Sequence, residues 1–172
     1  MIGTLVSTGR RRDLAAGQQR AIVVVAAIFS AWVIYANLFT ISDPLVLGIL
    51  FVSGIYAIMF AAIGATPNAP DRIPFYDIAL SLLSLAAGIF FFVNATAIAD
   101  RISLLDPFTP AQLFFGISLL LLTLEATRRT TGMGLTIVVV AFLAYNWFGY
   151  LLPPPFGHGV DVQLRLPAEA EF

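Results

Sequence analysis

The chain has 172 residues, of which 59% are hydrophobic and 11% charged, and its formal net charge is −1. Soluble domains carry about 25% charged residues, so this composition excludes an ordinary soluble domain and indicates a multi-pass membrane protein. The chain contains no cysteine, which excludes disulfides, thiolate chemistry and Cys-ligated metal centres.

A polar leader precedes the first apolar segment. Residues 1–20 hold four arginines and predict a cytoplasmic leader. The apolar run at residues 21–39 has 19 residues, which is longer than the roughly 7–15 residues of a cleavable signal peptide. At ~1.5 Å per residue this run covers about 28 Å, close to the thickness of the hydrocarbon core of a bilayer. We therefore predict an uncleaved first span.

Four further apolar segments follow the first one. They predict spans at about 44–63, 75–97, 110–127 and 135–152, followed by a polar periplasmic tail at 153–172. The expected fold is therefore an all-α integral membrane bundle of five transmembrane helices. Four spans with a re-entrant or interfacial fifth segment form the structural alternative.

Two of these spans have a clear start signal. Asp43-Pro44 and Thr109-Pro110 each combine a good N-cap residue with a proline. Proline suits the first position of a helix, because its missing N–H has no partner there in any case. We expect helices to begin at Pro44 and at Pro110.

The placement of arginine predicts the orientation of the chain. With the N-terminus in the cytoplasm, seven of the nine arginines lie on the cytoplasmic side, and only Arg101 and Arg165 lie outside. Short cytoplasmic loops of membrane proteins are enriched in arginine and lysine. The sequence therefore predicts the N-terminus inside and, after five spans, the C-terminus outside.

A compact group of charges ends the fourth predicted span. No charge occurs from Phe108 to Leu124, and then Glu125, Arg128 and Arg129 follow within about one helical turn. On a helix Glu125 faces both arginines, at i+3 and i+4, so the group can partly neutralise itself at the membrane boundary. Gly132 then lets the chain turn. Because both arginines have a partner on their own helix, we interpret the group as an anchoring or docking site rather than an anion-binding site.

The remaining candidate residues predict no chemistry. Asp77 falls in the first turn of the third predicted span, where the positive end of the helix dipole favours a carboxylate. We prefer this anchoring role to ion binding. His158 is the only histidine, and a single histidine without a second one or a cysteine does not make a metal site. We therefore expect no catalytic, metal or substrate-binding residues, no cofactor and no enzymatic activity in this chain.

The same charged stretch carries a family resemblance. The sequence Leu-Thr-Leu-Glu-Ala-Thr-Arg-Arg-Thr-Thr-Gly at 122–132 is followed by an apolar helix, Tyr145, Phe148-Gly149, three prolines and His158-Gly159. This pattern resembles the small-subunit region of TRAP (tripartite ATP-independent periplasmic) transporters. It is most similar to the subfamily served by TAXI-type solute-binding proteins, in which this region is often fused to the front of the large permease subunit. The resemblance is best from about Leu121 to Gly159.

The resemblance implies a small scaffold subunit of an ion-coupled transporter that imports organic anions across a bacterial or archaeal inner membrane. Its implied partners are a large permease subunit, a periplasmic TAXI-type binding protein and membrane lipid, without nucleic acid. Sodium is expected in the large subunit and not in this chain. Two alternatives stay open, namely the small subunit of a tripartite tricarboxylate transporter and a small membrane-embedded lipid-modifying enzyme. The Glu-Ala-Thr-Arg-Arg motif favours the first family, and the single histidine argues against the enzyme.

Overall fold

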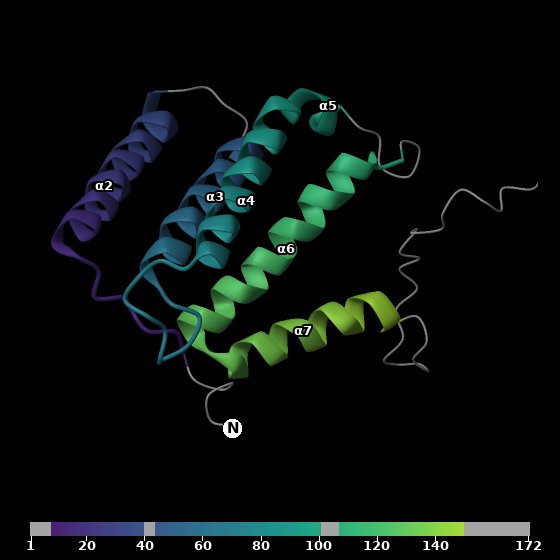
Figure 1. Cartoon of the computed structure of the whole chain (residues 1–172). Helices are drawn as coiled ribbons and strands as arrows, with labels where there is room; N and C mark the ends of the chain where they lie inside the picture. The colour runs from purple at the N-terminus through teal and green to yellow at the C-terminus, as the bar shows by residue number, and fades with distance from the viewer. Residues whose placement is uncertain (1–7, 40–43, 101–106, 150–172) are drawn as a thin grey trace, which may run out of the picture.

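The computed structural model describes residues 8–39, 44–100 and 107–149, and this part of the chain is all-helical. The leader from residue 8 to residue 15 is irregular rather than helical, apart from a single bridge residue at Arg11. Figure 1 shows a bundle in which consecutive long helices run in alternating directions, with α7 leaving the base of the bundle at an angle. The helices are α2 (Ala16–Phe39), α3 (Pro44–Ala62), α4 (Phe75–Val93), α5 (Ala95–Ala99), α6 (Pro110–Thr131) and α7 (Met133–Phe148).

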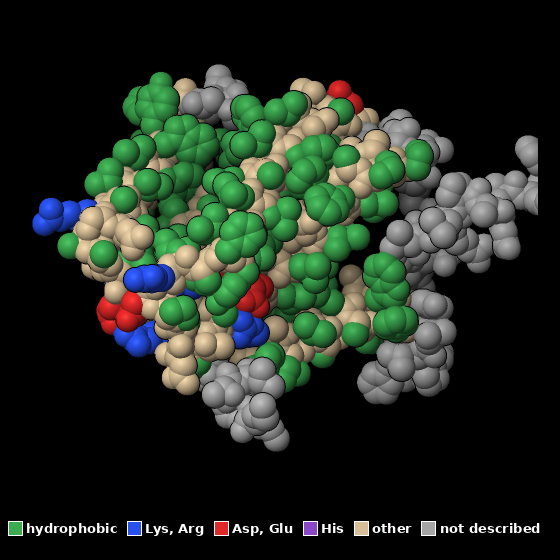
Figure 2. All heavy atoms as spheres, in the orientation of Figure 1, with side chains coloured by type: hydrophobic (Ala, Val, Ile, Leu, Met, Phe, Trp, Pro, Cys, Tyr) green, Lys and Arg blue, Asp and Glu red, His purple; other side chains and the backbone are tan. Residues whose placement is uncertain are grey.

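Three of the described helices, α2, α4 and α6, are long and apolar enough to cross a membrane. The apolar part of α3, Val46–Ala62, and α7 are shorter apolar helices. Hydrophobic side chains cover most of the face that Figure 2 shows. Ile28 of α2 and Phe142 of α7 are 64% and 68% exposed. Lipid accepts such an exterior, whereas water does not. The predicted all-helical, multi-pass membrane protein is therefore confirmed at this level.

Helices α3 and α4 form the tightest pair because small residues line their contact. The Ser84 hydroxyl donates to the Ser53 carbonyl at 2.7 Å, and the Ser81 hydroxyl donates to the Ala57 carbonyl at 3.0 Å. A Cβ atom added at Gly88 would lie 2.7 Å from the Ser53 Cβ, so the two backbones approach too closely for a larger residue. Small residues allow the same close packing in membrane helix pairs generally.

The hydrophobic core lies where α6 packs against α3 and α4. Its fully or nearly buried members are Met59 and Phe60 of α3 and Leu122 and Ala126 of α6. The Tyr56 hydroxyl donates to Thr123 Oγ1 at 3.1 Å and adds a polar link between α3 and α6. This core places the end of α6 beside the end of α3.

The helix starts at Pro44 and Pro110 agree with the sequence. Thr109 accepts a hydrogen bond from the Gln112 N–H, and the Gln112 side chain accepts one from the Thr109 N–H, forming a capping box. These two bonds satisfy two backbone donors that a helix start would otherwise leave unpaired. The other predicted cap, Asp43, lies outside the described residues.

Helix α7 begins at Met133, two residues before the predicted start, and three other predicted boundaries differ from the structure by four or five residues. Helix α2 begins at Ala16 rather than at residue 21, because nothing in Gly17-Gln18-Gln19-Arg20 ends a helix. Helix α4 ends at Val93 rather than at residue 97, and Asn94 separates it from the short helix α5. Helix α6 continues past residue 127 to Thr131, so that Arg128 and Arg129 belong to its last turn.

Gly132 joins α6 to α7 in a conformation that only glycine adopts readily. Its φ of 89° and ψ of 177° end α6, and its N–H donates to the Arg128 carbonyl at 3.1 Å. The turn predicted at this glycine is confirmed. The backbone at this glycine directs α7 away from α6. Helix α7 is short and largely exposed, and Thr136 is its buried residue.

Gly132→Ala is expected to destabilise the protein by about 1–3 kcal/mol, because this backbone region strains every residue with a Cβ. The matched control is Gly134→Ala, two residues further on in α7, where an added Cβ meets no atom within 4 Å. That control should be neutral or stabilising by up to about 1 kcal/mol, since alanine favours a helix over glycine. Thermal unfolding in detergent measures both variants. If the thermal unfolding midpoint of Gly132→Ala were equal to or above that of Gly134→Ala, backbone strain at residue 132 would be ruled out.

Candidate functional site

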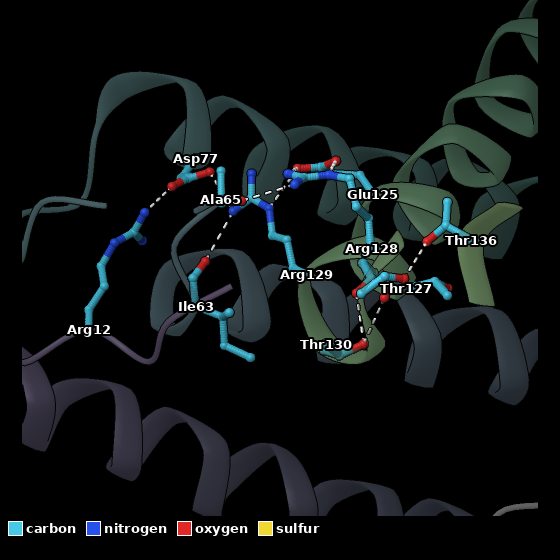
Figure 3. Close-up of polar contacts among 12 residues, drawn as sticks. Arg12, Ile63, Ala65, Asp77, Glu125, Thr127, Arg128, Arg129, Thr130 and Thr136 are labelled. Atoms are coloured by element: carbon cyan, nitrogen blue, oxygen red, sulfur yellow. Dashed lines mark hydrogen bonds and ion pairs between the residues drawn. The ribbon is translucent and has the colours of Figure 1, made fainter. Parts of the chain in front are cut away.

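Five charged side chains meet at one end of the bundle, and we name them the arginine–carboxylate cluster. The members come from three places in the chain, namely the leader, the start of α4 and the end of α6 (Figure 3). They are Arg12, Asp77, Glu125, Arg128 and Arg129.

Asp77 is the centre of the cluster. Its side chain is 0% exposed, and it lies between the guanidinium groups of Arg12 and Arg129, each 1% exposed. Arg12 Nη2 donates to Asp77 Oδ2, and Arg129 Nη1 forms an ion pair with Asp77 Oδ1 at 2.7 Å. Three charges without access to water are stable only when they are paired in this way. Asp77 Oδ1 forms no hydrogen bond with another described residue and is held by the ion pair with Arg129.

Glu125 forms the outer half of the cluster. Arg128 binds it through two parallel hydrogen bonds, from Nε to Oε2 and from Nη2 to Oε1, both at 2.7 Å. Arg129 Nε donates to Oε1 at 2.7 Å as well. This paired geometry is the strongest arrangement of an arginine and a carboxylate. The structure thus places Glu125 against both arginines, as the spacing of i+3 and i+4 predicts.

The three arginines of the cluster also bind backbone carbonyls at the end of α3. Arg12 Nη1 donates to the Phe60 and Ala61 carbonyls at 3.1 and 3.0 Å. Arg129 Nη1 donates to the Ile63 carbonyl, and Arg128 Nη1 to the Ala65 carbonyl, each at 3.0 Å. The last carbonyls of a helix have no partner within it and carry partial negative charge. The cluster therefore caps α3 and joins it to α6.

Helix ends explain why these charges collect here. Antiparallel packing brings the carbonyl ends of α3 and α6 next to the amide end of α4 (Figure 1). The amide end favours Asp77 and the carbonyl ends favour arginine. The face of the Phe60 ring adds a further contact, because the Arg129 guanidinium carbon lies 4.9 Å from its centroid.

The leader is part of the folded bundle and not a separate polar segment. The Gly9 N–H donates to the Arg129 carbonyl at 2.8 Å, and the Arg12 N–H donates to the Ala62 carbonyl at 3.0 Å. Arg11 and Ile63 pair as an isolated antiparallel bridge. These bonds hold the leader across the base of α3 and α6, and so deliver Arg12 to Asp77.

Sequence reasoning missed Arg12 as a partner of Asp77. It assigned Asp77 to the helix dipole alone and treated the arginines of the leader as an orientation signal. The sequence did contain a signal for an ion pair. Asp77 is a carboxylate beside an apolar segment, where it needs a positive partner, and the leader contains three consecutive arginines. Which arginine turns inward depends on the bridge at Arg11, which exposes that side chain and buries its neighbour.

A second, exposed set of charges surrounds the cluster. Arg10 Nη2 donates to Asp13 Oδ2 at 2.6 Å and lies 3.6 Å from Asp71 Oδ1. The pKa of the Arg10 guanidinium lies above its ordinary value, because Asp13 accepts a hydrogen bond from it and both carboxylates attract its charge. Arg11, Arg20 and Arg72 are exposed and form no ion pair with another described residue.

The described chain also contains an apolar groove. It lies between α2 on one side and α3 and α4 on the other, with a volume of about 520 Å³. Ala21 and Ile73 line its end near the charges, and Trp32 and Ile89 line its other end. None of the five residues of the cluster lines the groove, so the cluster and the groove are separate features.

The other predicted site residues divide by whether the structure describes them. Gly132 follows the cluster directly and ends its helix. His158 lies outside the described residues. Within the described ranges, no three His, Asp or Glu side chains are arranged to hold a metal ion. With its charges bound to one another and to backbone, the cluster is built to join the leader and three helix ends.

Comparisons with protein-family models, with curated proteins and with solved structures found no match to this chain.

Proposed function

We propose that this chain is a small, non-catalytic scaffold subunit of an ion-coupled secondary transporter of the TRAP type, in the inner membrane of a bacterium or archaeon. In this proposal it holds a large permease subunit, which binds sodium and an organic anion that a periplasmic TAXI-type protein delivers. The motif at 122–132 supports the proposal through its resemblance to the small-subunit region of these transporters.

The observation that carries the proposal is that the charges of the described helices lie near the helix ends and not at their centres. Arg20, Asp77 and the cluster residues of α6 all lie within two turns of a helix end, and α3 and α7 contain no charge. A site that moves a charged solute needs compensating groups near the middle of the membrane, often at paired broken helices. The charges of the arginine–carboxylate cluster are already bound to one another. A supporting role for a second, substrate-binding subunit accounts for this arrangement.

The proposal includes five spans with the N-terminus in the cytoplasm. The seven described arginines support that orientation, because they all lie in the leader, at the start of α2, before α4 or at the end of α6. Alternating helix directions bring these segments to one end of the bundle (Figure 1). Cytoplasmic ends of membrane helices carry such an excess of positive charge. In this proposal α7 belongs to the fifth span, and residues 150–152 of the predicted span lie outside the described residues.

Reconstitution into liposomes tests the proposal. We expect uptake of an organic anion when the liposomes hold this chain and the large subunit, with the binding protein outside and an inward sodium gradient. Liposomes with this chain alone should show only background uptake, and the two membrane subunits should co-purify from detergent as a stable pair. Solute uptake by this chain alone, or failure of the pair to form, would overturn the scaffold function.

A further inference from the structure

We propose that the apolar groove between α2 and the α3–α4 pair binds one acyl chain of an anionic phospholipid, with the lipid phosphate held by Arg20 and Arg72. The proposal rests on the placement of these helices in a membrane, and it does not depend on the transporter function. Three observations carry it, namely the length of the groove, its apolar walls and the charges at its end.

The groove is about as long as one leaflet of a bilayer. It follows α2 from Ala21 to Trp32 and α3 from Ala61 back to Leu50, so both walls extend over 11 residue steps. At ~1.5 Å per step this is about 16 Å, and half of the hydrocarbon core is about 15 Å. A lipid whose head lies at the charged end would reach the far end of the groove with its acyl chain.

The groove has a volume of about 520 Å³. The walls are apolar, formed by side chains such as Val25, Phe29, Ile58 and Leu82. An acyl chain suits such walls, because it is itself wholly apolar.

The charged end of the groove offers two arginines without a carboxylate partner. Arg20 directly precedes Ala21, and Arg72 directly precedes Ile73, and these two neighbours line opposite walls. Both arginines are exposed and form no ion pair among the described residues, unlike Arg10 and the three arginines of the cluster. Basic sites between membrane helices on the cytoplasmic side bind anionic lipid head groups. The charges therefore select phosphate-bearing lipid with net negative charge.

Trp32 allows a direct test, because it lines the groove and the only other tryptophan is Trp147. In full-length Trp147→Phe protein in detergent micelles, phosphatidylglycerol brominated near the middle of its acyl chains should quench Trp32 fluorescence. Quenching should saturate at one lipid per chain. Brominated phosphatidylcholine should bind far more weakly, and glycerol phosphate should not displace the brominated lipid, because it has no acyl chain.

Two matched pairs of variants locate the lipid. Arg20→Gln/Arg72→Gln should weaken phosphatidylglycerol binding about 30-fold, at about a tenfold change per 1.4 kcal/mol and about 1 kcal/mol per arginine. Arg10→Gln/Arg11→Gln removes the same charge at the same end and should leave binding nearly unchanged. Val25→Phe should reduce saturable quenching by filling the groove, whereas Val24→Phe should not. Val24 and Val25 are 55% and 54% exposed, and only Val25 lines the groove.

Three results would overturn the proposal. Equal quenching by the two brominated lipids would show a non-specific shell of lipid. Equal effects of the two arginine pairs, or of the two valine variants, would place the lipid elsewhere. A dimer by light scattering that Val25→Phe dissociates would assign the groove to a second copy of this chain. None of these results bears on whether the large subunit is required for uptake.

Discussion

Arg12→Ala is expected to lower the free energy of unfolding by about 3–5 kcal/mol, which is the usual cost of removing one partner from a buried ion pair. The Arg12 side chain is 1% exposed and forms bonds to Asp77 and to the carbonyls of Phe60 and Ala61. Without it, a buried carbonyl, a partly buried carbonyl and part of a buried carboxylate lose their partners. Unfolding in detergent, followed by circular dichroism, measures the loss.

The adjacent residue is the matched control for that variant. Arg11 has the same charge and the same place in the leader, but its side chain is exposed and forms no ion pair with another described residue. Arg11→Ala is therefore expected to change stability by no more than about 0.5 kcal/mol. Equal losses for the two variants would mean that the leader contributes through its overall charge and not through the bond to Asp77.

Asp77→Asn is expected to have an effect of the same size. The change keeps the shape of the side chain but removes the charge between two guanidinium groups that are each 1% exposed. The Arg12 charge then has no acidic partner in the cluster, and Arg129 keeps only Glu125, so about 3–5 kcal/mol should be lost. Asp71→Asn is the control, because Asp71 is 53% exposed and lies 3.6 Å from Arg10. Such an exposed pair contributes at most about 1 kcal/mol.

A double variant separates pairing from general damage. In an Arg12→Met background one of the two buried cations is already gone, so Asp77→Asn should cost clearly less than in the natural chain. Contacting residues in one ion-pair network show coupling energies of about 0.5–3 kcal/mol. Strictly additive losses would show that Arg12 and Asp77 contribute independently, and would remove the leader from the cluster.

Local features of this chain were predictable from its sequence. The composition and the long apolar runs indicated a helical membrane protein, because a helix is one of the few structures that satisfy all backbone groups inside lipid. Thr109-Pro110 and Gly132 marked the two ends of α6, and both lie there in the structure. The contacts of Glu125 with Arg128 and Arg129 followed from their spacing, since three and four residues along a helix always share a face.

Contacts between distant segments were decided by the tertiary structure alone. Arg12 and Asp77 are 65 residues apart in the sequence, and no periodicity relates a leader to the first turn of α4. They meet because antiparallel packing gathers the ends of α3, α4 and α6, and because the bridge at Arg11 turns the next side chain inward. The groove arises in the same way, since α2 lies against α3 but leaves an open space beside α4. Sequence spacing specifies which residues share one helix face, whereas only packing determines which helix ends and which faces meet.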